Sequence, residues 1–317
     1  MSVLHRRTAG FVLAASLMLA GCGSESDRID VDLDGSGENA VAGIYRVTLS
    51  STTGNSRDED WLFLLAAPQS TVEPVARIAG YDRNDPQRIM VGQYRQGVGQ
   101  TLTGALRFYD IVTEEIEEPS EDPEVEEPVI TEIEVRRTRS LTLSGVFDPR
   151  NTLDATFTGQ SEDGDSVGDG RVYGEYQERA YERLSSVAAI TGDWRRQDEF
   201  GFDAVTFNYG GDTGVFGLAP DPVSGSQCRY DGRFSLINAR FNIYAISMDQ
   251  SGCGTTDTPG GTPPLRTMQG LATLRDIPVG EDPEDAREML MIMGSAPSLD
   301  DGLAEGRVFR LERSTGP

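Results

Sequence analysis

The chain contains no lysine, and its single histidine, His5, lies in an N-terminal segment with the pattern of a cleavable leader. All 28 basic residues are therefore arginine. Without histidine or lysine, the rest of the chain has no Ser-His-Asp triad or Cys-His dyad, no Schiff-base lysine and no histidine-ligated metal site. We therefore predict that the protein is not an enzyme, has no catalytic residues and needs neither a cofactor nor a metal.

Motifs of nucleotide-dependent and hydrolytic enzymes are also absent. The sequence has no P-loop, no dinucleotide-binding glycine motif, no Gly-x-Ser-x-Gly and no His-Glu-x-x-His. Two carboxylates could support glycoside hydrolysis, but a chain with 52 acidic residues contains such pairs by necessity. A carboxylate-dependent hydrolase is thus the weaker alternative.

Positive charge is scarce, since 28 arginines face 52 acids and the net charge is −24. Nucleic-acid phosphates require stripes of basic residues, so we predict no nucleic-acid partner and no charge-driven binding to anionic lipids. Hydrophobic residues make up only 37% of the chain, and 36 glycines indicate many turns rather than long helices.

Residues 1–21 are predicted to be a signal peptide. Arg6 and Arg7 precede an apolar stretch that is too short to span a bilayer. The following Leu19-Ala20-Gly21-Cys22 resembles the lipobox of bacterial lipoproteins. The resemblance implies that Cys22 carries the lipid, palmitate included, as the first residue of the mature chain. Gly23 in place of aspartate favours the outer membrane, with the protein facing the periplasm or the cell surface.

Residues 22–41 are predicted to form a flexible acidic tether. Within it, residues 30–35 resemble the start of an EF-hand calcium loop, but position 12 of that loop is Val41 instead of glutamate. A second acidic turn at residues 162–170 could hold calcium but is equally typical of a turn between strands. We therefore predict no metal site in either segment.

From residue 42 onward, short runs of β-branched and aromatic residues alternate with turn residues. This pattern predicts an all-β fold of two antiparallel β-barrel or β-sandwich domains joined by a short helical linker. The expected boundaries are 42–177 for the first domain, 178–190 for the helical linker, 191–313 for the second domain and 314–317 for a tail.

The two halves open alike, with Gly43-Ile44-Tyr45 and Gly192-Asp193-Trp194. These segments resemble the Gly-x-Trp first strand of lipocalin-type barrels, which implies that each aromatic ring closes one barrel end beneath an arginine of the last strand. A small apolar ligand beneath Trp194 is the alternative to a purely structural plug, and its binding residues are unknown.

Cys228 and Cys253 are the two cysteines left after lipidation of Cys22, and they flank two predicted strands. An even count in an oxidising compartment predicts a disulfide between them. A redox-active pair is the alternative, although such pairs usually have Cys-x-x-Cys spacing.

The most biased segment is an acidic insertion in the first domain at 114–134. Residues 117–128 contain seven carboxylates and three prolines, flanked by alternating strand-like runs. We predict a long hairpin with an extended tip, because like charges repel and proline lacks a backbone donor. A divalent-cation brush, a contact for a basic partner and a simple solvated loop are its possible roles.

The closest overall resemblance is to a group of uncharacterised proteobacterial lipoproteins with a lipobox, an acidic tether and two small β domains. The joining segment 181–194 and a C-terminal domain with a cysteine pair carry this resemblance. It implies a membrane contact through the lipid anchor and an architecture, but no chemistry. We predict a structural or interaction module of the cell envelope, with an envelope protein as its possible partner.

Overall fold

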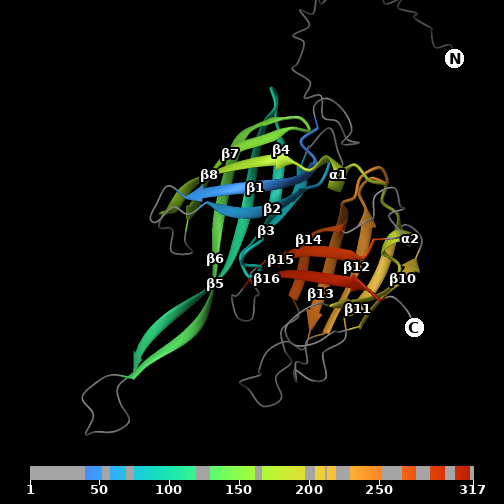
Figure 1. The fold of residues 1–317 in the computed structure, drawn as a ribbon. Helices are drawn as coiled ribbons and strands as arrows, with labels where there is room; N and C mark the ends of the chain where they lie inside the picture. The colour runs from blue at the N-terminus through green and yellow to red at the C-terminus, as the bar shows by residue number, and fades with distance from the viewer. Residues whose placement is uncertain are drawn as a thin grey trace, which may run out of the picture.

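The computed structural model describes residues 40–51, 58–68, 75–118, 129–160, 166–196, 204–210, 213–218, 229–251, 266–275, 286–296 and 304–314. Within these ranges the chain is all-β, as predicted, and its strands form two antiparallel barrels that lie side by side (Figure 1). The barrel alternative, not the sandwich, is therefore the one that the structure adopts.

In the first barrel, each strand pairs with the next along the chain, and β8 returns to pair with β1 through Tyr45 and Tyr176. Its strands are β1 (Gly43–Ser51), β2 (Glu59–Leu65), β3 (Val75–Asp82), β4 (Ile89–Gln96), β5 (Thr101–Glu118), β6 (Val129–Asp148), β7 (Thr152–Gln160) and β8 (Ser166–Tyr176).

The second barrel repeats this order. The short strand β9 pairs with both β10 and β16, which closes the ring. Its strands are β9 (Gly192–Arg196), β10 (Ala204–Gly210), β11 (Thr213–Leu218), β12 (Arg229–Leu236), β13 (Tyr244–Ser251), β14 (Arg266–Arg275), β15 (Glu288–Ser295) and β16 (Gly306–Arg313). All described strands lie within the predicted ranges 42–177 and 191–313, whose boundaries stay a prediction.

The segment between the barrels is helical only in part, which corrects the prediction of a helical linker over 178–190. Two four-residue helices, α1 (Glu178–Tyr181) and α2 (Val187–Ile190), are separated by a non-helical stretch. The Ser185 amide donates to the carbonyl of Ala239, and Ser186 caps α2 by accepting from the Ala189 amide at 3.0 Å. These serine contacts compete with helical pairing and begin a new helix instead of extending the first.

The barrels pack against each other through a third cluster of buried apolar residues, distinct from the two barrel interiors. Strand β15 shows how this arises: Met289, Met291 and Met293 belong to the interior cluster, whereas Leu290 and Ile292 belong to the cluster between barrels. Both faces of this strand are therefore buried, which explains why its sequence is a continuous apolar run instead of an alternation.

Tyr109 of β5 fixes this packing. Its hydroxyl donates to the carbonyl of Ser295 at 2.7 Å, and its ring lies directly over two glycines of the second barrel. A Cβ atom built on Gly294 would lie 2.4 Å from the Tyr109 oxygen, and one built on Gly306 would lie 2.8 Å from the ring. Only glycine allows the ring to approach this closely.

Candidate functional site

The residues predicted to be modified lie outside the described residues. This applies to Cys22 and the rest of the leader and tether, to Cys228 and Cys253, and to the first acidic segment at 30–35. The strands flanked by the cysteine pair are described, and β12 pairs with β13 from Arg229 opposite Ser251. Lipidation and the disulfide thus stay predictions.

Trp194 closes one end of the second barrel, as the lipocalin-like pattern implies. Its buried indole nitrogen donates to the Ile190 carbonyl at 3.0 Å, and the Arg313 guanidinium lies 4.5 Å from the ring centroid. Arg313 belongs to the last strand, β16, six residues after Arg307. It donates to the carbonyls of Ala189 at 2.5 Å and Ala286 at 2.8 Å, so the plug is tied to the chain on both sides.

Tyr45 has the equivalent place in the first barrel but a different partner. Its hydroxyl donates to the carbonyl four residues earlier, Val41, as Trp194 does with Ile190. Its ring meets Tyr176 edge-on at 5.7 Å, whereas Arg171 of the last strand forms an exposed ion pair with Asp154. The arginine-on-aromatic arrangement therefore belongs to the second barrel.

The interior beneath Trp194 is packed with side chains of the barrel itself. Trp194 belongs to a buried cluster whose larger members are Phe234, Tyr244, Ile246, Met248, Met268, Met289, Met291, Met293, Phe309 and Leu311. An apolar ligand at this position would have to displace them. The ligand-carrier alternative stays a prediction.

Arginine and aromatic groups close the end of the first barrel from which β5 and β6 emerge. The Arg88 guanidinium lies 5.7 Å from the Trp61 ring and 5.4 Å from the Phe108 ring, and it pairs with Glu59 at 2.6 Å and Asp82 at 3.0 Å. Cation–π and ion-pair contacts of this kind hold a partly buried arginine in place. These side chains therefore form a structural plug at this end of the barrel.

Asp110 lies at the same end of the barrel, 3.6 Å from Arg139. Burial raises the pKa of its carboxyl group, against the opposing effect of the Arg88 and Arg139 charges. A raised carboxyl pKa is a property of some catalytic acids, but ion pairing to arginine is equally a structural arrangement. Among the described residues, no group of three or more His, Cys, Asp or Glu side chains could hold a metal ion.

Beyond this plug, β5 and β6 leave the barrel as a two-stranded ribbon (Figure 1). The pairing of β5 with β4 ends at Tyr109, and the pairing of β6 with β7 begins at Ser140, whereas β5 and β6 stay paired out to Glu118 opposite Val129. Residues 110–118 at about 3.3 Å each extend the ribbon by about 30 Å. The acidic hairpin is thus longer and more regular than its sequence suggests, and its tip at 119–128 lies outside the described residues.

The two faces of the ribbon differ, because the pairing register sorts its side chains. Val112 lies opposite Val135, and Ile116 and Ile133 are diagonal neighbours on the same face. These four residues form what we call the apolar stripe. Ile116 is 38% exposed and Ile133 is 36% exposed. On the same face Glu114 pairs with Arg137, so the charge beside the stripe is largely neutralised.

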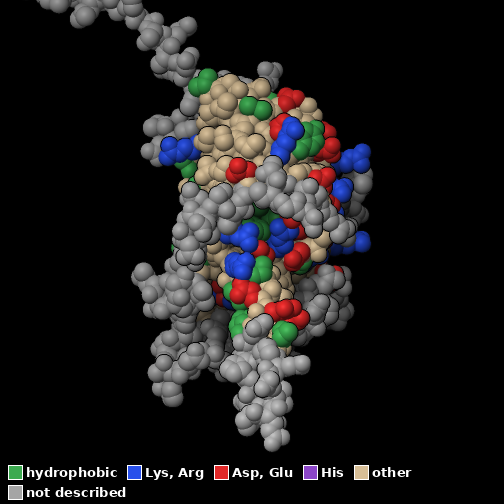
Figure 2. All heavy atoms as spheres, turned by 90° about the vertical axis from the view of Figure 1, so that its left-hand side faces the viewer, with side chains coloured by type: hydrophobic (Ala, Val, Ile, Leu, Met, Phe, Trp, Pro, Cys, Tyr) green, Lys and Arg blue, Asp and Glu red, His purple; other side chains and the backbone are tan. Residues whose placement is uncertain are grey.

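The opposite, acidic face carries Glu115, Glu132 and Glu134, with Glu115 directly opposite Glu132. Ile130, which is 59% exposed, also lies on this face. Like charges opposite each other on a sheet destabilise the pair. Arginine side chains lie among the acidic and hydrophobic ones on the face shown in Figure 2.

A buried carboxylate ties the base of the ribbon to the second barrel. Glu305 is 5% exposed and forms ion pairs with Arg136 of β6, Arg266 of β14 and Arg307 of β16. Gln250 also donates to it, at 3.2 Å. Burial acts to raise the pKa of Glu305, but the three arginine charges outweigh burial and lower it. This network fixes the direction in which the ribbon leaves the body.

Sequence reasoning identified the acidic hairpin and missed the apolar stripe. The alternation of Ile130, Glu132 and Glu134 with Thr131, Ile133 and Val135 was visible in the sequence. Which of these residues share a face with Ile116 depends on the register with β5, which the sequence does not specify. Comparison of the chain with protein-family models, curated proteins and solved structures found no match.

Proposed function

We propose that the protein is a non-enzymatic interaction module of the cell envelope, anchored to the outer membrane through Cys22, and that the β5–β6 ribbon is its contact element for a basic protein partner. The observation that carries this proposal is the apolar stripe on a ribbon that projects about 30 Å from the barrel. Within the described residues, no helix is long and apolar enough to cross a membrane.

An isolated two-stranded ribbon is marginally stable in water, so covering its apolar stripe would stabilise it. This supports a role of the stripe in a protein contact. Val112, Ile116, Ile133 and Val135 give one face of the ribbon an apolar surface far from either barrel core. Exposed hydrophobic patches rimmed by polar residues are typical of protein contact sites. A partner that covers the stripe would stabilise the ribbon as well as gain affinity.

Charge decides which partner fits. The acidic face carries three glutamates, and the sequence places seven further carboxylates in 117–128. A second copy of this chain or an anionic lipid surface would be repelled by these charges, whereas a basic protein surface would be attracted and steered. The partner we infer therefore combines an apolar groove with a rim of lysine or arginine.

Site-specific photo-crosslinking in intact cells tests the proposal. A photoreactive phenylalanine analogue at Ile133, on the stripe, is compared with one at Glu132, its neighbour on the opposite face, and one at Thr156, exposed on β7. We expect one discrete adduct from position 133, weaker capture from 132 and none from 156. Yield in isolated envelopes should fall as salt rises, because screening weakens contacts between opposite charges.

A second pair of variants removes the contact without removing the ribbon. Ile116→Thr with Ile133→Thr keeps β-branched residues in the strands but removes most of the apolar surface. This pair should abolish the adduct from a probe at position 135, whereas Thr113→Val on the other face should leave it unchanged. Equal adducts from positions 133 and 156, or adducts indifferent to these variants, would show that the ribbon is not the contact element.

A further inference from the structure

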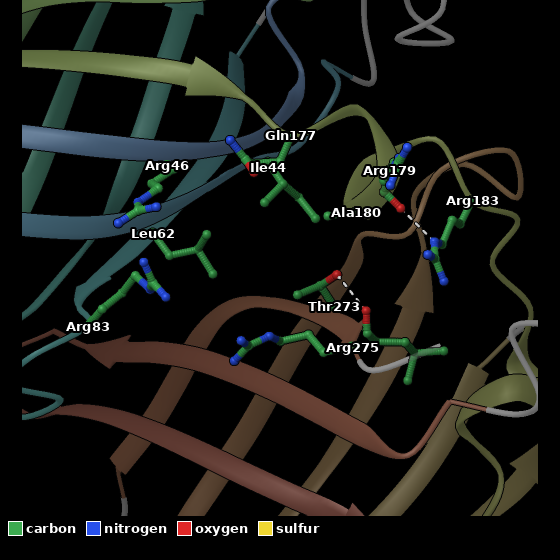
Figure 3. A pocket seen from close by; sticks show the side chains of 11 residues that line it. Ile44, Arg46, Leu62, Arg83, Gln177, Arg179, Ala180, Arg183, Thr273 and Arg275 are labelled. Atoms are coloured by element: carbon green, nitrogen blue, oxygen red, sulfur yellow. Dashed lines mark hydrogen bonds between the residues drawn. The ribbon is translucent and has the colours of Figure 1, made fainter. Parts of the chain in front are cut away.

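A second feature, independent of the ribbon, lies where the linker crosses the seam between the barrels. A cleft of about 410 Å³ opens there between β1, β2, α1 and the end of β14 (Figure 3). The described residues that line it are Ile44, Arg46, Leu62, Arg83, Gln177, Arg179, Ala180, Arg183, Thr273, Leu274 and Arg275. Its size falls within the range of sites that bind small organic molecules.

The residues that line this cleft are rich in arginine, in contrast to the acidic composition of the whole chain. Five of its eleven described lining residues are arginine and none is aspartate or glutamate, in a chain where 52 acids face 28 arginines. The arginines come from the first barrel, the linker and the second barrel, so only the folded arrangement brings them together (Figure 3). Because no carboxylate is among the described lining residues, an anion in the cleft would contact guanidinium groups directly.

The guanidinium groups on the first-barrel side are held in place by one shared carboxylate. Arg46 donates to both oxygens of Asp60, at 3.1 and 2.9 Å, and Arg83 pairs with Asp60 at 2.7 Å. The hydrogen bond from Arg46 lowers the pKa of Asp60, with the charges of Arg83 and Arg46 adding to it against burial. Glu175 of β8, directly opposite Arg46, also acts on its charge, so the two arginines are balanced by two carboxylates that hold their orientation.

Arg183 of the linker and Arg275 of the second barrel also have defined partners. Arg183 donates from Nε to the Arg179 carbonyl at 2.5 Å, and Arg275 pairs with Glu288 at 3.1 Å. Guanidinium groups with fixed orientation are suited to bidentate recognition of phosphate or carboxylate oxygens, because little rotamer freedom remains to be lost on binding. The cleft is thus preorganised for an anion.

The apolar lining indicates what else the ligand carries. Ile44 and Leu274 are already almost fully buried, whereas Leu62 and Ala180 are partly exposed and pack against the apolar cluster between the barrels. Inorganic phosphate alone would leave this surface uncovered. A ligand with an apolar or aromatic body would cover it and gain from its burial.

We infer that the cleft between the barrels binds a small organic phosphate, with the phosphate oxygens on the cleft arginines and the apolar body against Leu62 and Ala180. The phosphate can belong to a free molecule or to a lipid headgroup, and the two sources share this chemistry. The proposed membrane-anchored module would then bind a small ligand at a site separate from its ribbon.

Isothermal titration of the full-length protein in a neutral detergent, at about physiological salt, tests the inference. The probes are 1-naphthyl phosphate, the neutral analogue 1-naphthol, and dihexanoyl phosphatidic acid as a soluble phospholipid. We expect saturable 1:1 binding of naphthyl phosphate and none of naphthol. Binding of the phosphatidic acid as well would identify a headgroup site, and its absence a site for free ligands. Failure of both phosphates to bind at millimolar concentration would overturn the inference.

Charge-matched variants separate a local site from general electrostatics. Arg83→Gln with Arg275→Gln removes one arginine from each barrel wall, and we expect affinity to fall at least about ten-fold, since two charge-assisted hydrogen bonds are lost. Arg171→Gln with Arg195→Gln removes the same charge from exposed positions outside the cleft and should change affinity less than about two-fold.

Arg179→Gln alone, at an exposed linker position, provides an independent loss of affinity if the double variant folds poorly. Unchanged thermal melting identifies variants that are properly folded. If the Arg171→Gln, Arg195→Gln control lost as much affinity as the cleft variants, the inference would be overturned, because the loss would reflect net charge alone.

Discussion

Glu305 gives the sharpest test of how the two barrels are held, and Glu305→Gln is the perturbation. The substitution keeps the shape of the side chain but removes the charge that Arg136, Arg266 and Arg307 share. Removing one partner of a buried ion pair leaves the other charge without compensation, which typically costs about 3–5 kcal/mol.

The exposure of the three arginines sets the expected loss within that range. The Arg136 and Arg307 side chains are 45% and 33% exposed, so both can regain water, whereas Arg266 is 9% exposed and cannot. We therefore count one stranded buried charge and expect a loss of about 3 kcal/mol in the free energy of unfolding, or on the order of 10 °C in Tm. Asp154→Asn, which breaks the exposed pair with Arg171, should cost much less, because solvent screens both charges.

Urea unfolding followed by tryptophan fluorescence measures this loss barrel by barrel. The chain has two tryptophans, Trp61 in the first barrel and Trp194 in the second. In a Trp61→Phe background the remaining signal reports on the second barrel, where Arg266 and Arg307 lie. Most of the loss should appear there.

The contribution of Glu305 to the free energy of unfolding depends on pH in a defined direction. The pKa of Glu305 is lowered in the folded protein from its ordinary value of 4.5. Its contribution to stability is therefore fully present above pH 4.5 and is lost as the pH falls through the lower folded pKa. The gap between the wild type and Glu305→Gln should narrow over that acidic range. A loss no larger than that of Asp154→Asn, or a gap that stays constant in acid, would refute the reasoning.

Four further predictions concern the anchor, the cysteines, the hairpin tip and the barrel plug. Cys22→Ala should abolish fatty-acid labelling and release the protein to the periplasm; continued labelling would contradict the lipobox assignment. Cys228 and Cys253 should resist alkylation in denatured, unreduced protein, and two reactive thiols would exclude the disulfide. Deleting residues 117–128 should leave folding intact, with no calcium-specific gain in thermal stability in the parent protein relative to magnesium; a calcium gain lost on deletion would make the tip a cation site. Trp194→Ala should cost about 3–5 kcal/mol in urea unfolding followed by circular dichroism, and a loss below about 1 kcal/mol would show that the plug is not structural.

The sequence predicted the fold class because strands and turns are encoded locally. Alternating apolar and polar residues, as in β13, place every second side chain inside, and glycine-rich breaks separate the strands. The burial of Trp194 at the start of the second barrel was expected only from the resemblance to the Gly-x-Trp first strand of lipocalin-type barrels. The linker prediction failed where Ser185 and Ser186 bond to the backbone instead of continuing a helix, a competition that composition alone does not resolve.

Composition and local pattern by themselves determined the all-β class, the acidity, the scarcity of histidine and the presence of a hairpin. Tertiary structure alone decided which residues meet. The apolar stripe depends on the register between β5 and β6, and Tyr109 bonds to a carbonyl 186 residues away. The arginine cleft likewise collects residues from both barrels and the linker. Such contacts follow from strand register and barrel packing, because a shift of one residue reverses the face of every side chain in a strand.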